Sequence, residues 1–250
     1  MRLFHTNKKA VYSTHFYRHW CQARHLTSFS VTIKETDLWI KAQRLLITQA
    51  KEAVFKYRAQ LEKYIYFHPI FKKSLFPLPF DPFAPKIVQR MLKAAQNTGV
   101  GPMAAVAGAI AQAVGEELLS YSEEVVVENG GDIFLKNKTP MHISIFAGQS
   151  PLSGRIGIRI EPDSSPIAIC TSSGKIGHSF SYGKADAVTV VAKDAALADA
   201  AATAIGNLIN KKEDIQTGIK LGQKINGIVG LLIILNEHLA IWGQIDLVKV

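Results

Sequence analysis

The sequence predicts an α+β protein in which Ala-rich helices pack on a mixed, largely antiparallel sheet. Strand-like runs follow one another between residues 124 and 170 without helices between them, which indicates antiparallel pairing. Two helix-length segments, 101–119 and 194–209, consist mainly of Ala and other small residues. A third segment, nearer the N-terminus, shows clear helical periodicity.

The first half of the chain yields four elements. Residues 29–34 alternate between apolar and polar side chains, as a half-buried strand does, and 37–41 offers a hairpin partner. Apolar residues then recur at steps of three and four from 44 to 66, which predicts a long amphipathic helix ending at His68-Pro69. The segment 75–85 contains four prolines and is expected to be a surface loop.

The second half alternates between helices and strands. A short helix is expected over 86–97, ended by Gly99, and the small-residue helix 101–119 follows it. Strands are expected at 124–128, 133–136, 141–146, 155–160, 167–170 and 187–193. After the helix 194–209, the apolar tail is expected to form a hairpin that turns at Asn236-Glu237.

Length and composition narrow the class of protein. We expect a single domain over residues 1–250, with 75–85 as the best candidate for an internal boundary. No apolar run reaches the roughly 18 residues of a spanning helix, and the N-terminus lacks the apolar core of a secretory signal. Two cysteines are too few for a disulfide framework. The sequence therefore predicts a cytoplasmic protein without a membrane partner.

The net charge of +9 is concentrated in the first third of the chain. Residues 1–75 hold 14 Lys and Arg against 4 Asp and Glu. None of the usual nucleic-acid-binding motifs accompanies this charge, so we interpret it mainly as the solvated face of the 44–66 helix. No nucleic-acid partner is expected, and the oligomeric state is left open.

The stretch Asn129-Gly130-Gly131-Asp132 separates two apolar runs. One hypothesis is a tight turn with an Asp cap. The other is a ligand-contacting loop, because two glycines let the backbone approach a ligand where a Cβ would clash. The N-terminus of the 101–119 helix also allows two interpretations: its free amides could bind an anion, or it could be the ordinary capped end of a core helix.

Two further patterns contain candidate metal-binding or catalytic residues. Asp199 and Thr203 are four residues apart, so they share one helix face and together offer hard oxygen ligands suited to Mg²⁺. The segment 170–182 combines Cys170, several hydroxyls and His178. Cys170 and His178 could act as nucleophile and base, although a thiol after a strand is more often buried and inert.

Several blocks of the sequence resemble one family. ENGGDIFL, GHSFSYGKADAVTVVA and LADAAATAIGN, in that order, resemble the ApbE flavin transferases. More closely, and over nearly the whole chain, the sequence resembles the uncharacterised ApbE-like family of bacteria and archaea, through GVGPMAAVAGAIAQAVG, VVVENGGDI, AGQSPLS and CTSSGKIGHSFSYGKADAVTV.

The resemblance implies an ApbE-like fold and a site that binds FAD with Mg²⁺, from which FMN is moved to a Thr of an acceptor protein. Asp199, Thr203 and a main-chain oxygen near Ala107 would be the metal ligands, and His178 and Cys170 the catalytic candidates. The cofactor-binding positions would be Gly130, Gly131, Asp132, Ser179 and Gly183.

Two departures from the ApbE pattern keep the reaction open. The stretch VAGAIAQAVG lacks the Lys and Asp that the transferases carry there, and GHSFSYGKAD keeps His178 but not the Asp-Pro of their loop. Three hypotheses remain: an ApbE-like enzyme dependent on Mg²⁺ and a flavin or other nucleotide, a non-catalytic flavin or small-molecule carrier, and an enzyme of sulfur chemistry that uses Cys170.

Overall fold

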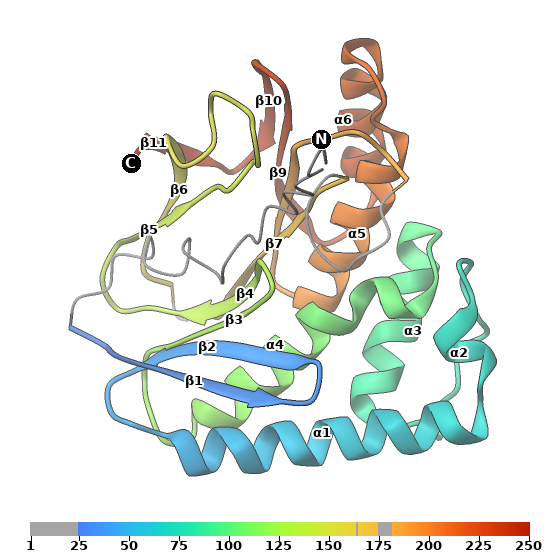
Figure 1. Ribbon diagram of the computed structural model, residues 1–250, viewed down its shortest axis with the longest axis vertical. Coiled ribbons are helices and arrows are strands. Elements are labelled where there is room, and N and C mark those ends of the chain that lie inside the picture. Colours follow the sequence, from blue (N-terminus) through green and yellow to red (C-terminus); the bar gives the residue numbers. More distant parts are fainter. Residues whose placement is uncertain (1–24, 164, 175–181) are drawn as a thin grey trace, which may run out of the picture.

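The computed structural model describes residues 25–163, 165–174 and 182–250 (Figure 1). Eight of the strands in this part of the chain form one large sheet. In spatial order they are β1 (Thr27–Ile33), β2 (Thr36–Ala42), β3 (Val125–Asn129), β4 (Asp132–Lys136), β7 (Ile167–Ser172), β8 (Ala187–Ala192), β9 (Ile228–Leu235) and β10 (His238–Gly243). A smaller sheet has the order β11 (Asp246–Lys249), β6 (Ile156–Ile160) and β5 (Met141–Ser144).

The helices lie on one side of the large sheet. They are α1 (Ile47–Phe67), α2 (Ile70–Lys73), α3 (Lys86–Thr98), the 3₁₀ turn η2 (Pro102–Ala105), α4 (Val106–Leu118), α5 (Ala195–Leu208), the 3₁₀ turn η3 (Lys212–Asp214) and α6 (Ile215–Lys224). The small sheet packs on the other side, so the molecule has three layers (Figure 1). The expected α+β class is confirmed, and every strand pairing among the described residues is antiparallel.

Most expected elements lie within a few residues of their predicted bounds. Gly99 ends α3 with a φ of 78°, a left-handed conformation that Gly adopts without steric cost. The 101–119 segment differs, because it begins with η2 and becomes α-helical only at Val106. The expected hairpin at Asn236-Glu237 is also present, as the turn between β9 and β10.

Several elements were not predicted from the sequence, among them α2, α6 and β11. α6 was not expected, although its buried residues Ile215, Gly218, Ile219 and Gly222 have helical spacing. The second strand of the tail hairpin was expected to continue, but the chain leaves β10 at Gly243, whose φ is 80°. The last strand, β11, therefore pairs with β6 in the small sheet.

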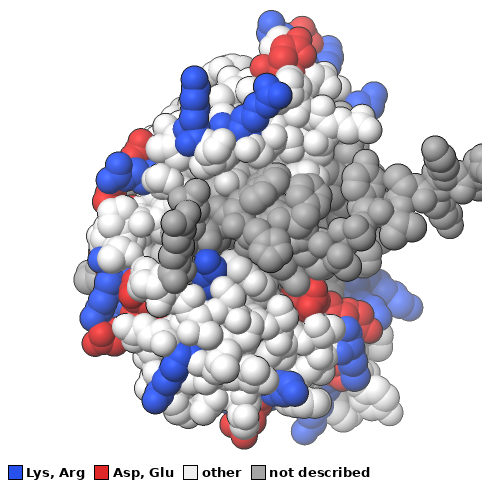
Figure 2. Space-filling model, turned by 60° about the vertical axis from the view of Figure 1, so that its left-hand side comes forward, with Lys and Arg blue, Asp and Glu red and all other residues white. Residues whose placement is uncertain are grey.

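Two of the four basic residues of α1 form ion pairs with acidic residues in the described part of the chain. Lys56 lies 2.9 Å from Glu117, and Arg58 lies 2.6 Å from Glu35 and 2.8 Å from Glu62. Figure 2 shows basic and acidic side chains interspersed on the face turned toward the viewer. Surface pairs of this kind add little stability, but they neutralise part of the positive charge of α1, so that it forms no continuous basic surface there.

Membrane-spanning potential is limited in the part of the chain that the structure describes. No single helix there is both long and apolar enough to cross a bilayer. The segments Lys86–Thr98 and Pro102–Leu118 meet the length and composition only as a pair, and the chain bends by 108° between them.

Candidate functional site

The β3–β4 connection is a two-residue turn. Asn129 pairs with Asp132, and the φ angles of Gly130 and Gly131 are 66° and 104°. A tight hairpin turn with two positive φ angles favours Gly, Asn or Asp at its first position and Gly at its second, so Gly-Gly fits it. A Cβ at Gly130 would meet no atom within 4 Å. Turn geometry therefore accounts for both glycines, and their contact with a nucleotide stays a prediction.

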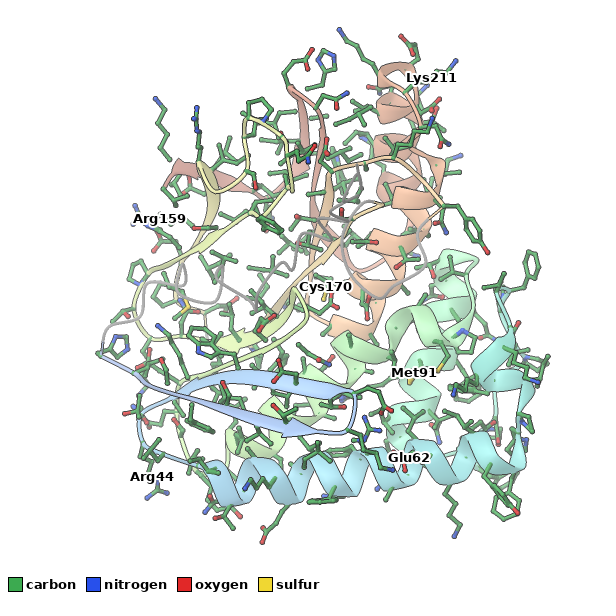
Figure 3. The ribbon with its side chains drawn as sticks, viewed as in Figure 1. Arg44, Glu62, Met91, Arg159, Cys170 and Lys211 are labelled. Atoms are coloured by element: carbon green, nitrogen blue, oxygen red, sulfur yellow. The ribbon has the colours of Figure 1, made fainter. Side chains whose placement is uncertain are left out.

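A row of polar side chains crosses the sheet beside this turn. Asn129, Asp132 and Cys170 are neighbours in register on β3, β4 and β7. Alternation along the strands directs all three toward the helical layer. Figure 3 shows Cys170 at the centre of the molecule, where β7 meets the helices. The row thus lies under the junction of α4 and α5.

The first turn of α4 supplies the other half of this junction. The amide of Gly108 donates a 2.9 Å hydrogen bond to Oδ2 of Asp199 on α5. Nδ2 of Asn129 donates to the carbonyl oxygen of Ala107 over 3.0 Å. A carboxylate at a helix N-terminus is favourable, because free amides and the helix dipole both favour negative charge there. Of the two alternatives for this helix start, the structure shows a carboxylate of the same chain, Asp199, bound by a first-turn amide of α4.

Burial makes this cluster electrostatically unusual. The pKa of Asp199 is raised to about 7 by burial, and hydrogen bonds from the amides of Gly108 and Ala107 act against that rise. The pKa of Asp132 is raised well above its ordinary value, first by burial and then by the charge of Asp199. Two carboxyl groups in one low-dielectric region cannot both ionise without cost. A cation bound between them would relieve this cost.

The donor set fits Mg²⁺ in its chemistry. Asp199 and Thr203 are one helical turn apart and only 9% and 7% exposed. No group of three or more His, Cys, Asp or Glu side chains among the described residues is arranged to hold a metal. Mg²⁺ is usually held by one or two carboxylates, with water and phosphate oxygens completing its shell, and a Mg²⁺ site at Asp199 and Thr203 stays a prediction. The Ala107 carbonyl already accepts from Asn129, so its role as a ligand stays a prediction.

A buried hydroxyl extends the polar row. Oγ of Ser172 is buried and has no hydrogen-bond partner among the described residues. Ser172 lies two residues after Cys170 on β7, so its side chain is on the same face of the sheet. A buried hydroxyl without a partner is costly in a folded protein. It suits a position that hydrogen-bonds a ligand.

The predicted loop residues His178 and Ser179 lie outside the described residues. The ends of their segment are nevertheless fixed. A Cβ on Gly174 would stand 1.9 Å from the carbonyl oxygen of Gly183, and one on Gly183 would stand 1.8 Å from that of Gly206. Gly206 is three residues after Thr203 on α5, so Gly183 packs on α5 one turn from Thr203, and Gly174 packs on Gly183. Gly183 is therefore required for packing, and its predicted contact with a cofactor remains a prediction.

Cys170 does not have the surroundings of a nucleophile. It is fully buried, and its Sγ lies 3.5 Å from the carbonyl oxygen of Ala195. Burial and the charges of Asp132 and Asp199 raise its pKa well above the ordinary thiol value. A reactive cysteine needs the opposite, an exposed thiolate in a positive environment.

We therefore expect Cys170 to resist alkylation in the native protein. Iodoacetamide should leave it unmodified under native conditions and modify it completely in denaturant, because only unfolding brings the thiol into water. Peptide mass spectrometry identifies the modified residue. Stoichiometric native labelling with loss of activity would contradict this assignment and restore the sulfur-chemistry hypothesis.

Further residues at the α4–α5 junction were not predicted from the sequence. Gly108 was one small residue among many, yet a Cβ there would stand 2.2 Å from the carbonyl oxygen of Ala195. Oε1 of Gln112 accepts a 2.8 Å hydrogen bond from the amide of Ala195. Gly within a helix costs about 1 kcal/mol relative to Ala, so its position among alanines was the available signal. Asn129 and Ser172 lie in segments that the sequence had marked, 129–132 and 170–182, but neither was itself predicted as a site residue.

The raised pKa of Asp199 predicts a pH-dependent stability. Its ordinary value is 3.8, so between about pH 4 and 7 the folded state binds this proton more tightly than the unfolded chain. The stabilisation is complete below about pH 4 and is lost as the pH rises to about 7. The pKa shift of the neighbouring Asp132 has the same sign.

We expect the Tm of the metal-free protein to fall over this range, and the fall to be smaller in Asp199→Asn. Thermal unfolding in EDTA, measured for both proteins across the range, isolates the contribution of this carboxyl group. Equal pH dependence in the two proteins would show that Asp199 does not carry it.

Comparison with known proteins identifies the family. A family model described as AbpE bacteria matches residues 18–225. The UPF0280 protein of Methanosarcina barkeri is 44% identical over 216 residues, which cover 85% of each chain. The UPF0280 protein of Methanocaldococcus jannaschii is 39% identical over 226 residues, which cover 88% of this chain and 92% of that protein.

Solved structures share the fold at low identity. The apo form of the flavinyl transferase ApbE from Pseudomonas stutzeri has a TM-score of 0.56 at 15% identity and covers 87% of this chain and 93% of its own. The ApbE protein of Thermotoga maritima has a TM-score of 0.54 at 14% identity, with 86% and 96% covered. These two comparisons show the ApbE-like fold expected from the sequence. Together with the family match, they show that the chain belongs to the ApbE-like family that includes the UPF0280 proteins.

Proposed function

We propose that this chain binds FAD or a related nucleotide together with Mg²⁺ at the α4–α5 junction and transfers the FMN moiety to an acceptor. The observation that supports this best is the buried carboxylate of Asp199, held by the first-turn amide of Gly108 and placed near a second buried carboxylate, Asp132. The fold shared with a flavinyl transferase supports the choice of flavin.

Each group at the junction has a proposed role. Asp199 and Thr203 would hold the ion, with the Ala107 carbonyl as the third protein ligand that the resemblance implies. Mg²⁺ bound there would neutralise charge on the phosphate oxygens of the nucleotide. Ser172 is the proposed hydrogen-bond partner of the nucleotide, because its hydroxyl is buried and without a partner among the described residues.

The transfer itself is a displacement at phosphorus. An acceptor hydroxyl oxygen forms a bond to the phosphorus of the FMN moiety, the bridging P–O bond of the pyrophosphate breaks, and AMP leaves with that oxygen. The hydroxyl proton passes to a base. His178 is proposed for this role, because imidazole accepts a proton near neutral pH.

A non-catalytic carrier is the second candidate. The residues 106–115 lack the Lys and Asp that the transferases carry there, and this observation favours binding without turnover. A Cys170-dependent enzyme is not favoured, because the thiol is buried and its pKa is raised.

Equilibrium binding tests the proposal. Calorimetric titration of the full chain with FAD, FMN and ATP, each with and without Mg²⁺, should show FAD binding that requires the metal. Release of AMP from bound FAD in the presence of hydroxyl-bearing acceptors then separates a transferase from a carrier. Absence of binding by all three nucleotides would refute the transferase and the flavin carrier, and would leave only a carrier of another small molecule.

A further inference from the structure

A group of large apolar side chains lies exposed at one edge of the molecule. The edge comprises the end of α1, α2 and the loop before α3, and Figure 1 shows this segment away from the small sheet. Its exposed members are Tyr66, Phe67, Ile70, Leu75, Phe76, Phe80 and Phe83. Phe83 is 96% exposed, Tyr66 77% and Phe76 74%. We call this group the aromatic edge. Exposed apolar side chains concentrated in this way mark interaction surfaces.

The backbone that carries the aromatic edge is held in place. Phe71 is buried in the core between the exposed residues. Asp81 accepts a 3.0 Å hydrogen bond from the hydroxyl of Tyr64 and a 2.9 Å bond from the amide of Phe83. Four prolines further restrict the loop. The exposure of these side chains is therefore fixed by packing and hydrogen bonds.

The charges beside the aromatic edge are mostly positive. Lys63, Lys72, Lys73 and Lys86 are exposed, and no ion pair is recorded for them within the described residues. Between residues 63 and 86 the single acidic residue is Asp81, which is hydrogen-bonded to Tyr64. The edge thus joins apolar side chains with exposed lysines that have no ion-pair partner in the described part of the chain.

We propose that the aromatic edge binds the surface of an anionic membrane. Insertion of the exposed aromatic and aliphatic side chains at the headgroup level would remove them from water, and the lysines would attract anionic lipid headgroups. The apolar side chains project outward from three successive pieces of chain. A fluid lipid surface adapts to such a shape, whereas a protein partner would need a matching concave surface. This differs from the expectation of no membrane partner based on composition.

The edge also adjoins the chain that leads into the candidate site. A Cβ on Gly101 would stand 1.9 Å from the carbonyl oxygen of Ser74, which immediately follows α2. Residues 102–105 then form η2, which precedes α4 and packs against α2. Membrane binding through this edge would therefore involve the segment that leads directly into α4. The proposal does not depend on the nature of the nucleotide.

Vesicle flotation with the full chain tests the proposal. We expect binding to vesicles of phosphatidylcholine mixed with phosphatidylglycerol, weaker binding as salt is added, and little binding to phosphatidylcholine alone. Phe76→Ser combined with Phe83→Ser should weaken binding at least tenfold. Lys72→Glu combined with Lys73→Glu should do the same. Phe55→Ser is the matched control, because Phe55 is a 61% exposed aromatic on α1 outside the edge, and it should bind as the wild type does.

Other results would overturn the proposal. All variants change exposed side chains, and circular dichroism with thermal unfolding verifies that each is folded. Equal binding by the double Phe variant and the wild type would remove the edge from the interaction. A wild-type mass of two chains in light scattering, reduced to one chain in the double Phe variant, would assign the edge to a second copy. If the protein bound vesicles only after residues 1–24 were deleted, the aromatic edge would be assigned to the binding of that segment in the full chain.

Discussion

Asp199→Asn is expected to lower the Mg²⁺-dependent affinity for FAD at least 100-fold, which corresponds to about 2.7 kcal/mol. The amide keeps an oxygen that can accept from Gly108, so the link between α4 and α5 is preserved. It removes the negative charge that a divalent cation requires. Calorimetric titration with FAD in the presence and absence of Mg²⁺ measures the effect.

The chain offers a matched control on the same helix. Asp194 is the N-cap of α5, and its Oδ1 accepts a 2.8 Å hydrogen bond from the amide of Leu197. Asn caps helices as well as Asp does, so Asp194→Asn removes one charge and leaves the fold intact. It should bind FAD as the wild type does. If both variants lost affinity equally, the effect would be one of general charge, and the metal-site assignment would be wrong.

Asp199→Asn also distinguishes a role in ligand binding from a role in stability. We expect this substitution to cause no loss of stability at neutral pH, because burial raises the pKa of Asp199 and thereby opposes its ionised form. A Tm at pH 8 that is equal to or above that of the wild type would agree with this account. A large fall in Tm would show that the ionised carboxylate is needed for the fold itself.

Gly108→Ala is expected to lower the free energy of unfolding by roughly 1–3 kcal/mol, as overpacking in a rigid core does. Its Cβ would stand 2.2 Å from the carbonyl oxygen of Ala195 and 2.9 Å from Cβ of Asp199. Both belong to α5, so the two helices would have to separate. The higher helix propensity of Ala opposes this loss by about 1 kcal/mol. Chemical denaturation measures the net change.

Gly218→Ala on α6 is the control for this prediction. The atoms nearest to its Cβ are methyl groups of Ile209, Ile233 and Ile205, at 2.8 to 3.1 Å. The ends of flexible side chains move at little cost, so we expect a much smaller change in stability than at Gly108. FAD binding should weaken in Gly108→Ala but not in Gly218→Ala, because only the first substitution displaces Asp199. Unchanged stability and binding in Gly108→Ala would mean that α4 and α5 do not approach as closely as described.

Local patterns of the sequence determined most of the secondary structure. Apolar residues at helical spacing defined α1, and small residues defined α4 and α5, because these patterns express which face of a helix is buried. Glycine at Gly99 and the Gly130-Gly131 pair marked a helix end and a hairpin turn through backbone sterics. The same patterns, with longer matching blocks, sufficed to identify the family.

The sequence also singled out Asp132, Cys170 and Asp199, but not their relation. They are far apart along the chain, and only strand register and the packing of α5 bring them into one buried region. That burial raises the pKa of Cys170 and argues against its use as a nucleophile. The aromatic edge shows the same limit: composition gives the number of aromatic residues, while exposure depends on which of them the fold covers. The tertiary structure alone decided these points, because burial and electrostatic coupling arise between segments that no local pattern connects.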